Sequence, residues 1–158
     1  MTEPPTTIDA AVRWTPELEQ LHHKLVTDGF VRYCCGPRDN PHLLLAYYDW
    51  PDYLDLTTIR TYDHITAARI PKLHGRQVDV FAPHQAVWTC QGPAEPTLRA
   101  LLHLPHPAHP GAPTQPFPAP VELHVPRRDQ RPLTIKLPTP EQRRVRAERL
   151  AATLLATL

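Results

Sequence analysis

Three histidines recur at every third residue of the chain, at His103, His106 and His109. Imidazole is a common metal ligand, and a polyproline helix with three residues per turn would place all three rings on one side. The rise of about 3.1 Å per residue separates the outer pair by roughly 19 Å, too far for one metal with bonds of about 2 Å. We interpret them as linker histidines, with weak metal adhesion as the alternative, and predict no metal site.

Carboxylates surround a turn that also carries four aromatic side chains: Tyr47, Tyr48, Trp50 and Tyr53. The spacing of Asp49, Asp52 and Asp55 lacks the glycine and closing glutamate of an EF-hand, so a cation site is not favoured. We expect Asp52 to serve the turn and the other two carboxylates to face solvent. Tyr and Trp are favoured interface anchors, so we predict a protein-binding surface here, and we expect half of the four aromatics to lie in the sheet-facing core instead.

Nothing in the sequence resembles a catalytic constellation. The thiols of Cys34, Cys35 and Cys90 have no family signature around them, and no spacing brings them to Asp63-His64. The chain has only five glycines and lacks a phosphate-binding loop as well as HExxH, CxxC and GxSxG motifs. We predict no catalytic residue and no cofactor. An enzyme with an unidentified pocket, lined by Asp63, His64 or His84, stays as a third hypothesis.

Arginine outnumbers lysine 14 to 3, and arginines gather near the C-terminus. The candidates for contacts with nucleic-acid phosphates are Arg127, Arg128, Arg131, Arg143, Arg144 and Arg146. The sequence pI of about 7.9 and the lack of aromatics in 121–158 argue against nucleic-acid binding. An arginine bias is also typical of a G+C-rich coding sequence. Nucleic-acid association is therefore the second hypothesis.

The uncharged segment Pro105–Pro120 contains seven prolines among 16 residues and separates two parts of opposite charge. Residues 1–104 carry 9 Lys/Arg and 12 Asp/Glu, a net charge of −3, whereas residues 121–158 carry 8 and 4, a net charge of +4. Opposite charges indicate either docking of one part on the other or a polyanionic partner for the C-terminal part.

Turn residues and periodicity predict the elements. Helices are expected at 16–28, capped by Thr15, at 96–102, and after the capping box that Thr139 and Gln142 form. The final helix carries an apolar stripe: Val145, Ala147, Leu150, Ala151, Leu154, Leu155 and Leu158. Strands are expected at 30–35, 43–50, 53–62, 78–81 and 86–90, the first three as an antiparallel meander. Residues 65–70 are a short strand or a helical turn.

The C-terminal part is expected to fold as a hairpin of 121–125 and 133–137 followed by the helix. Its 38 residues rarely suffice for independent folding, yet its apolar faces require burial. We expect it to dock on residues 15–104, with a dimer that swaps this part as the alternative. The prediction is a single domain over 1–158, with 105–120 as an extended strap.

The predicted fold class is therefore α+β: a mostly antiparallel sheet with an N-terminal helix, a C-terminal hairpin and an amphipathic C-terminal helix. No secretory signal and no long apolar stretch is visible, and the three cysteines are odd in number, so a reduced cytoplasmic protein is expected. The leading functional hypothesis is a non-enzymatic protein–protein interaction or accessory module, with self-association as a homodimer among its forms.

Overall fold

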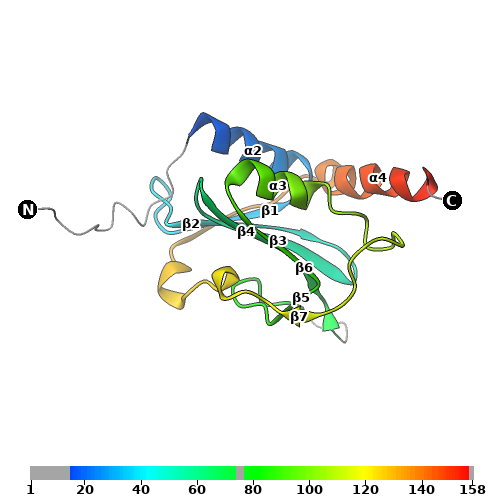
Figure 1. The fold of residues 1–158 in the computed structure, drawn as a ribbon. Helices are drawn as coiled ribbons and strands as arrows, with labels where there is room; N and C mark the ends of the chain where they lie inside the picture. The colour runs from blue at the N-terminus through cyan, green and yellow to red at the C-terminus, as the bar shows by residue number, and fades with distance from the viewer. Residues whose placement is uncertain (1–14, 74–76, 157–158) are drawn as a thin grey trace, which may run out of the picture.

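A six-stranded antiparallel sheet forms the centre of the computed structural model, which describes residues 15–73 and 77–156 (Figure 1). Within these residues the strand order is β6-β4-β3-β2-β1-β8. The strands are β1 (Val31–Cys35), β2 (Leu43–Asp49), β3 (Tyr53–Thr61), β4 (His64–Pro71), β6 (Trp88–Gly92) and β8 (Leu133–Lys136). The helices α2 (Pro16–Thr27), α3 (Ala94–Leu102) and α4 (Pro140–Ala156) cover one face, called the helical face here. The predicted α+β class is confirmed.

The opposite face, called the lower face, is covered by short elements. These are a two-stranded sheet of β5 (Gln85–Ala86) and β7 (Phe117–Pro118) and two 3-10 turns, η2 (Val121–Leu123) and η3 (Arg127–Asp129). Buried apolar side chains therefore lie on both faces of the sheet. The helical-face core includes Leu18, Phe30, Ile59 and Leu98, and the lower core includes Leu45, Leu56, Ile70 and Leu123.

Local signals explain the N-terminal elements. The Thr15 hydroxyl oxygen accepts a hydrogen bond from the N–H of Leu18 at 3.1 Å, which caps α2 as predicted. The chain then turns at Gly29, where φ is +92°. A Cβ atom at Gly29 would lie 2.5 Å from the carbonyl oxygen of Gln142, so glycine here also allows α4 to approach this turn.

The predicted meander is confirmed as β1, β2 and β3, and residues 65–70 belong to strand β4. The strand predicted at 78–81 is wrong, because the Asp79 carboxylate accepts the N–H of Phe81 and closes a turn. The strand predicted at 86–90 divides at Val87 between two sheets: β5 pairs with β7, and β6 pairs with β4.

The chain after α3 wraps around the sheet (Figure 1). Residues 103–116 descend from the helical face to β7, and η2 and η3 cross the lower face. The chain then adds β8 beside β1 and returns to the helical face as α4.

The predicted hairpin of 121–125 with 133–137 is wrong, since residues 121–123 form η2 and β8 pairs with β1. Prolines at 120 and 126 flank the first half and remove backbone donors that a strand pair needs. Leu123 and Val125 instead enter the lower core, where the N–H of Val125 donates to the carbonyl of Phe81 at 2.8 Å.

Helix α4 begins with the predicted capping box. The Thr139 N–H donates to Oε1 of Gln142 at 2.9 Å, and the Gln142 N–H donates to Oγ1 of Thr139 at 3.1 Å. The predicted apolar stripe holds at Leu150, which is buried, but Val145 is exposed. Leu158 lies outside the described residues. No helix in the described part of the chain has the length and apolar character needed to cross a membrane.

Candidate functional site

The four aromatic side chains proposed as one binding surface lie on both faces of the sheet. Tyr48 and Trp50 are buried on the helical face, where Tyr48 Oη donates to the carbonyl of Arg143 at 2.7 Å. Tyr53 packs against the same core, whereas Tyr47 packs against the lower core. The four side chains therefore do not form one surface, and the core position expected for half of them applies to Tyr48 and Trp50. Alternation of side chains along β2 explains the division.

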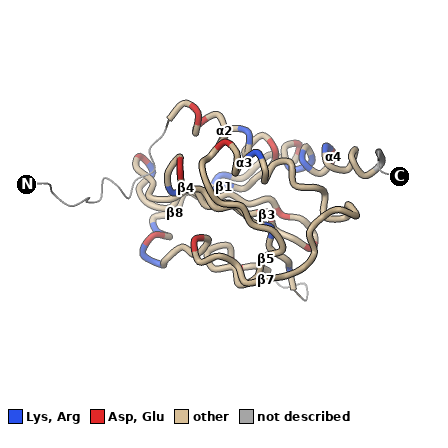
Figure 2. Tube along the Cα trace, in the orientation of Figure 1, with Lys and Arg blue, Asp and Glu red and all other residues tan. Residues whose placement is uncertain are grey.

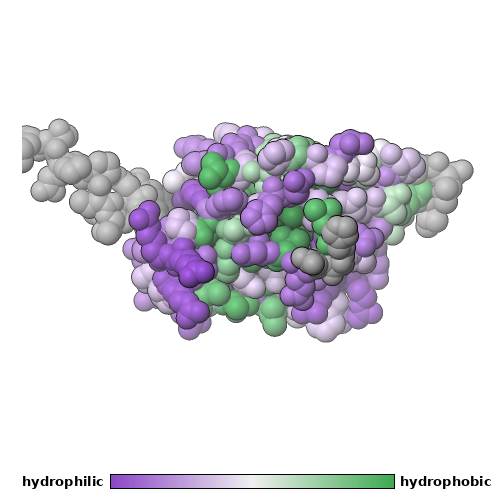
Figure 3. All heavy atoms as spheres, turned by 90° about the horizontal axis from the view of Figure 1, so that it is seen from below, coloured by the Kyte–Doolittle hydropathy of each residue, from purple (hydrophilic) through white to green (hydrophobic). Residues whose placement is uncertain are grey.

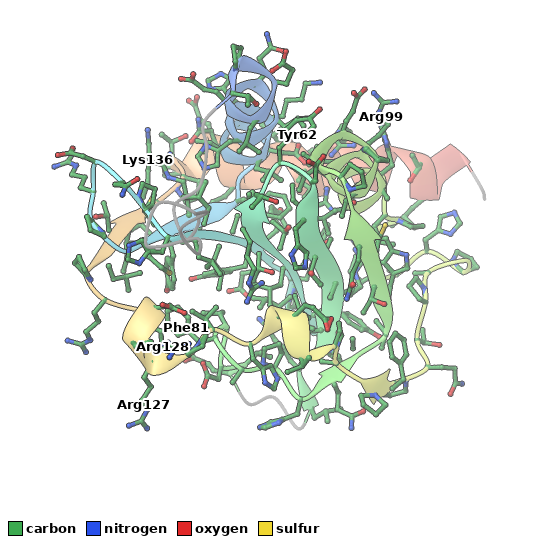
Figure 4. The ribbon with its side chains drawn as sticks, turned by 60° about the vertical axis from the view of Figure 1, so that its left-hand side comes forward. Tyr62, Phe81, Arg99, Arg127, Arg128 and Lys136 are labelled. Atoms are coloured by element: carbon green, nitrogen blue, oxygen red, sulfur yellow. The ribbon has the colours of Figure 1, made fainter. Side chains whose placement is uncertain are left out.

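The six arginines proposed for phosphate contacts separate into three settings (Figure 2). Arg127, Arg128 and Arg131 are exposed in and after η3, and Arg127 points away from the sheet (Figure 4). Arg143 and Arg144 are exposed at the start of α4, across the sheet from η3. Arg146 is fully buried, which corrects its assignment as a surface cation.

Asp55 is the centre of a buried ionic network. The prediction that its carboxylate faces solvent is therefore wrong. Both of its oxygens accept hydrogen bonds from Arg69, at 2.7 and 3.0 Å. Oδ2 also accepts from Arg146 at 2.8 Å and from Nε1 of Trp50 at 2.9 Å. The side chains of Asp55, Arg69 and Arg146 are 0% exposed. Strand β3 is buried on both faces, so the side chains on the same side of the strand as Asp55 point into the helical-face core.

Arg146 connects three elements to α4. Its guanidinium donates to the carbonyls of Leu101 and Leu102 at the end of α3, both at 2.9 Å, and to Asp28 at the end of α2, at 3.2 Å. The last carbonyls of a helix lack partners within the helix and carry partial negative charge, so a cation is favourable there. The guanidinium also lies 5.3 Å from the ring centroid of Phe30. These contacts indicate a structural role.

A cleft of about 410 Å³ lies between α2, α3 and α4 (Figure 4). Its walls include Leu21, Tyr62 and His103, but not the predicted Asp63, His64 or His84. Its arginines are already paired, Arg149 with Asp28 at 2.7 Å and Arg99 with Glu95. The cleft therefore offers a polar surface whose charges largely neutralise one another.

The side chains best suited to nucleophilic or metal chemistry are buried or already in contact with other groups of the fold. Burial, with smaller contributions from Cys34 and Asp129, raises the pKa of the Cys35 thiol to about 11, the opposite of what a nucleophile needs. The His106 ring packs on Trp50 at 4.8 Å, and the His109 Nδ1 accepts the N–H of Gly111. Within residues 15–73 and 77–156 no group of three or more His, Cys, Asp or Glu side chains is placed to hold a metal.

Acidification is expected to destabilise the fold through His22. Burial first, then the positive charges of Arg32 and Lys136, lowers the pKa of His22 from 6.5 to about 4. The unfolded chain binds this proton near pH 6.5, whereas the folded chain resists it until about pH 4. The free energy of unfolding should therefore fall as the pH drops through this window, by up to about 3 kcal/mol.

Urea unfolding between about pH 7 and about pH 4.5 measures this effect. His22→Gln should flatten the dependence of the free energy of unfolding on pH, whereas His64→Gln, at an exposed histidine, should leave it unchanged. Equal slopes for the wild-type chain and His22→Gln would contradict the assignment.

The sheet ends at β8, and this edge carries an apolar surface that the sequence analysis assigned to a hairpin. Ile135 and Leu133 pair with Tyr33 and Cys35 of β1, whose side chains belong to the lower core, so both point to the lower face. Ile135 is 51% exposed. Beside them the ring of Tyr33 packs edge-on against the ring of Tyr47, with centroids 5.6 Å apart, and at a tilt against the ring of Phe81, with centroids 5.8 Å apart. The alternation of 133–137 could have revealed this surface, but its location depends on the pairing with β1.

Comparison with known proteins finds no matching family model, no matching curated protein and no matching solved structure.

Proposed function

We propose that this chain is a non-enzymatic protein-interaction module that binds an extended polypeptide segment along the edge strand β8. The observation that carries the proposal is the combination of an end position in the sheet with exposed apolar side chains on that strand. Edge strands present unpaired backbone groups, and proteins commonly protect them with charge, proline or a covering element. An edge that keeps apolar side chains is suited to strand addition, in which backbone hydrogen bonds give affinity and alternate side chains give specificity.

The surroundings of β8 support the same function. Tyr33, Tyr47 and Phe81 form an aromatic cluster on the lower face next to the strand, and aromatic side chains are favoured in interface cores. Arg131 and Lys136 are exposed at the two ends of this edge and provide a charged border. An apolar centre with a polar border is the usual composition of a protein-binding patch.

Site-specific photocrosslinking tests the proposal. With a benzophenone amino acid at position 135 of the full chain, we expect discrete polypeptide adducts in extracts of the cells that make the protein. The matched control places the same group at Glu148, an exposed position on α4. Adducts that form at both positions alike, or none at position 135, would contradict the proposal. Mass spectrometry of the adducts tells a second copy of this chain from a different protein.

A further inference from the structure

Exposed apolar side chains concentrate at β8. Among the described residues, seven large hydrophobic side chains are exposed, and three of them are Leu133, Ile135 and Leu137. The register of β8 with β1 directs Leu133 and Ile135 to the lower face, and Leu137 shares their parity. Seen from below, hydrophobic side chains gather along one border of this face beside strongly hydrophilic ones (Figure 3). A stripe of three alternating apolar residues on an edge strand indicates a partner strand.

The backbone of the same residues faces outward. In an antiparallel pair, hydrogen-bonded and non-hydrogen-bonded residue pairs alternate. The N–H of Gly36 donates to the carbonyl of Pro132 at 2.8 Å, so the even-numbered residues of this strand bond to β1. The N–H and C=O groups of Leu133, Ile135 and Leu137 therefore point away from the sheet. The prolines of this segment, Pro132 and Pro138, occupy even positions, so the outer edge keeps all its donors.

We propose that the polypeptide bound at β8 is a second copy of this chain, paired β8 to β8 in antiparallel fashion about a two-fold axis through Ile135. The inference rests on the proposed function and names its partner. The outward-facing N–H and C=O groups of one copy must bond to those of the other, so odd-numbered residues pair with odd-numbered residues. Centring the pair on Ile135 places Ile135 opposite Ile135 of the second copy and Leu133 opposite Leu137.

Other registers match the side chains less well. A shift of the centre to residue 134 would place Leu137 opposite Arg131, and a shift to residue 136 would place Leu133 opposite Thr139. Only the register centred on Ile135 pairs all three apolar side chains with one another. Cross-strand apolar pairs stabilise an antiparallel pair by roughly 0.2–1 kcal/mol each, and the register is specified where one face is apolar.

Charge is compatible with this symmetric pairing. On the helical face of the new strand pair, Lys136 stands opposite Thr134 of the second copy, so no like charges are directly opposed. The two Lys136 side chains are diagonal neighbours, and their repulsion is weakened by salt. Salt should therefore preserve or strengthen the dimer, whereas it would weaken binding of an acidic peptide or a nucleic acid to the same edge.

The symmetric pairing also covers the exposed edge of the sheet. A two-fold interface uses the same patch on both copies and closes the assembly, so neither β8 edge stays open. At the other end of the sheet, the chain that follows α3 passes outside β6 (Figures 1 and 4), and none of the exposed large hydrophobic side chains described belongs to β6. The expected dimer is a continuous sheet joined at β8.

Sedimentation velocity of the full chain tests the dimer over a range from about 5 μM to about 500 μM, because small interfaces give micromolar affinities. The weight-average mass should rise from one chain to two. Ile135→Lys should weaken dimerisation at least about tenfold. The matched control is Val145→Lys, which makes the same type of change at an exposed apolar side chain on α4 and should leave dimerisation unchanged. Circular dichroism verifies that both variants are folded.

Cysteine crosslinking tests the register without a disruptive substitution. Residues in a hydrogen-bonded antiparallel pair have Cα atoms about 5.5 Å apart, a separation that a disulfide spans. Ile135→Cys should form a disulfide-linked dimer under mild oxidation, with the wild-type chain as the control for its native thiols. Leu133→Cys should not link to itself but should link to Leu137→Cys when the two variants are mixed.

A wild-type chain that stays monomeric over the whole range would overturn the dimer. A dimer equally stable in Ile135→Lys and Val145→Lys would also overturn it, and would indicate an interface elsewhere, such as a swapped C-terminal part. If position 135 crosslinks only to a different protein while the chain is monomeric, this inference fails and the proposed function stands. If position 135 forms no adduct at all, both fail.

Discussion

Asp55→Ala is expected to lower the free energy of unfolding by about 3–5 kcal/mol, because it leaves charges buried without their partner. Arg69 loses both carboxylate contacts, and Arg146 loses one of its two carboxylate partners. Neither guanidinium can reach water without movement of α4 or of the sheet, since both side chains are 0% exposed. Trp50 also loses the acceptor of its indole N–H.

Arg146→Met is expected to lower the free energy of unfolding by less than Asp55→Ala does. Asp55 keeps its two-point contact with Arg69, and Asp28 keeps Arg149 at 2.7 Å. The methionine side chain fills part of the volume between the rings of Phe30 and Tyr48. The carbonyls of Leu101 and Leu102 lose donors, however, so a cost of about 1–3 kcal/mol is expected.

Urea unfolding followed by tryptophan fluorescence measures these changes at neutral pH. The control is Asp49→Ala, which removes a carboxylate that is 62% exposed and paired with Lys72. Exposed pairs contribute at most about 1 kcal/mol, so this variant should stay close to the wild-type chain. If Asp55→Ala and Asp49→Ala lowered stability equally, the buried network would not hold α4 to the sheet.

The sequence predicts those parts of the fold that depend on neighbouring residues. The cap at Thr15, the capping box at Thr139 and the meander of β1 to β3 arise from contacts within a few residues or across short turns. Local hydrogen bonds and side-chain alternation are sufficient signals for such elements. The hairpin prediction failed because β8 pairs with β1, about a hundred residues earlier in the chain, and alternation does not identify a strand's partner.

The burial of Arg146 could not be predicted from periodicity. A helical pattern assigns apolar side chains such as Val145 to the interior and charged ones to solvent. Here the carboxylates of Asp55 and Asp28 and the last carbonyls of α3 form an anionic site under α4. That site exists only after three separate elements have come together. A buried charge is stable only with such partners, and none of them is near Arg146 in the sequence.

The candidate site was partly visible in the sequence. The alternation of Leu133, Ile135 and Leu137 indicated one apolar face, and the aromatics of 47–53 indicated a concentration of large side chains. Their assignment to solvent or core depends on which faces of the sheet are covered. In this fold both faces of β2 and β3 are covered, and the exposed apolar surface lies at the sheet edge.

Removal of residues 109–158 is expected to abolish cooperative folding of the rest of the chain. The truncated chain loses Leu123, Val125 and Leu150, all buried. Full burial of such side chains contributes about 1.5–3 kcal/mol each, so roughly 5–9 kcal/mol of stabilisation is lost. The total stability of a domain is typically about 5–15 kcal/mol.

Charge and strand pairing add to this loss. Without α4, Asp28 has neither Arg146 nor Arg149, and Asp55 has only Arg69 among its cationic partners. Without β8, strand β1 becomes an edge whose Arg32–Cys35 backbone is open to another chain. We therefore expect the fragment 1–108 to be aggregated or unfolded, with no sigmoidal urea transition.

A chain cut at Gly111 instead of shortened provides the control. Gly111 is exposed between two parts that contact each other through β8 and Arg146. A protease site inserted there should give two fragments that stay associated in native buffer and separate only in denaturant. If the fragment 1–108 were soluble, monomeric and as stable as the whole chain, docking of the C-terminal part would be dispensable. The cut chain that stays associated, beside a shortened chain that does not fold, would show that the contacts rather than the covalent connection stabilise the fold.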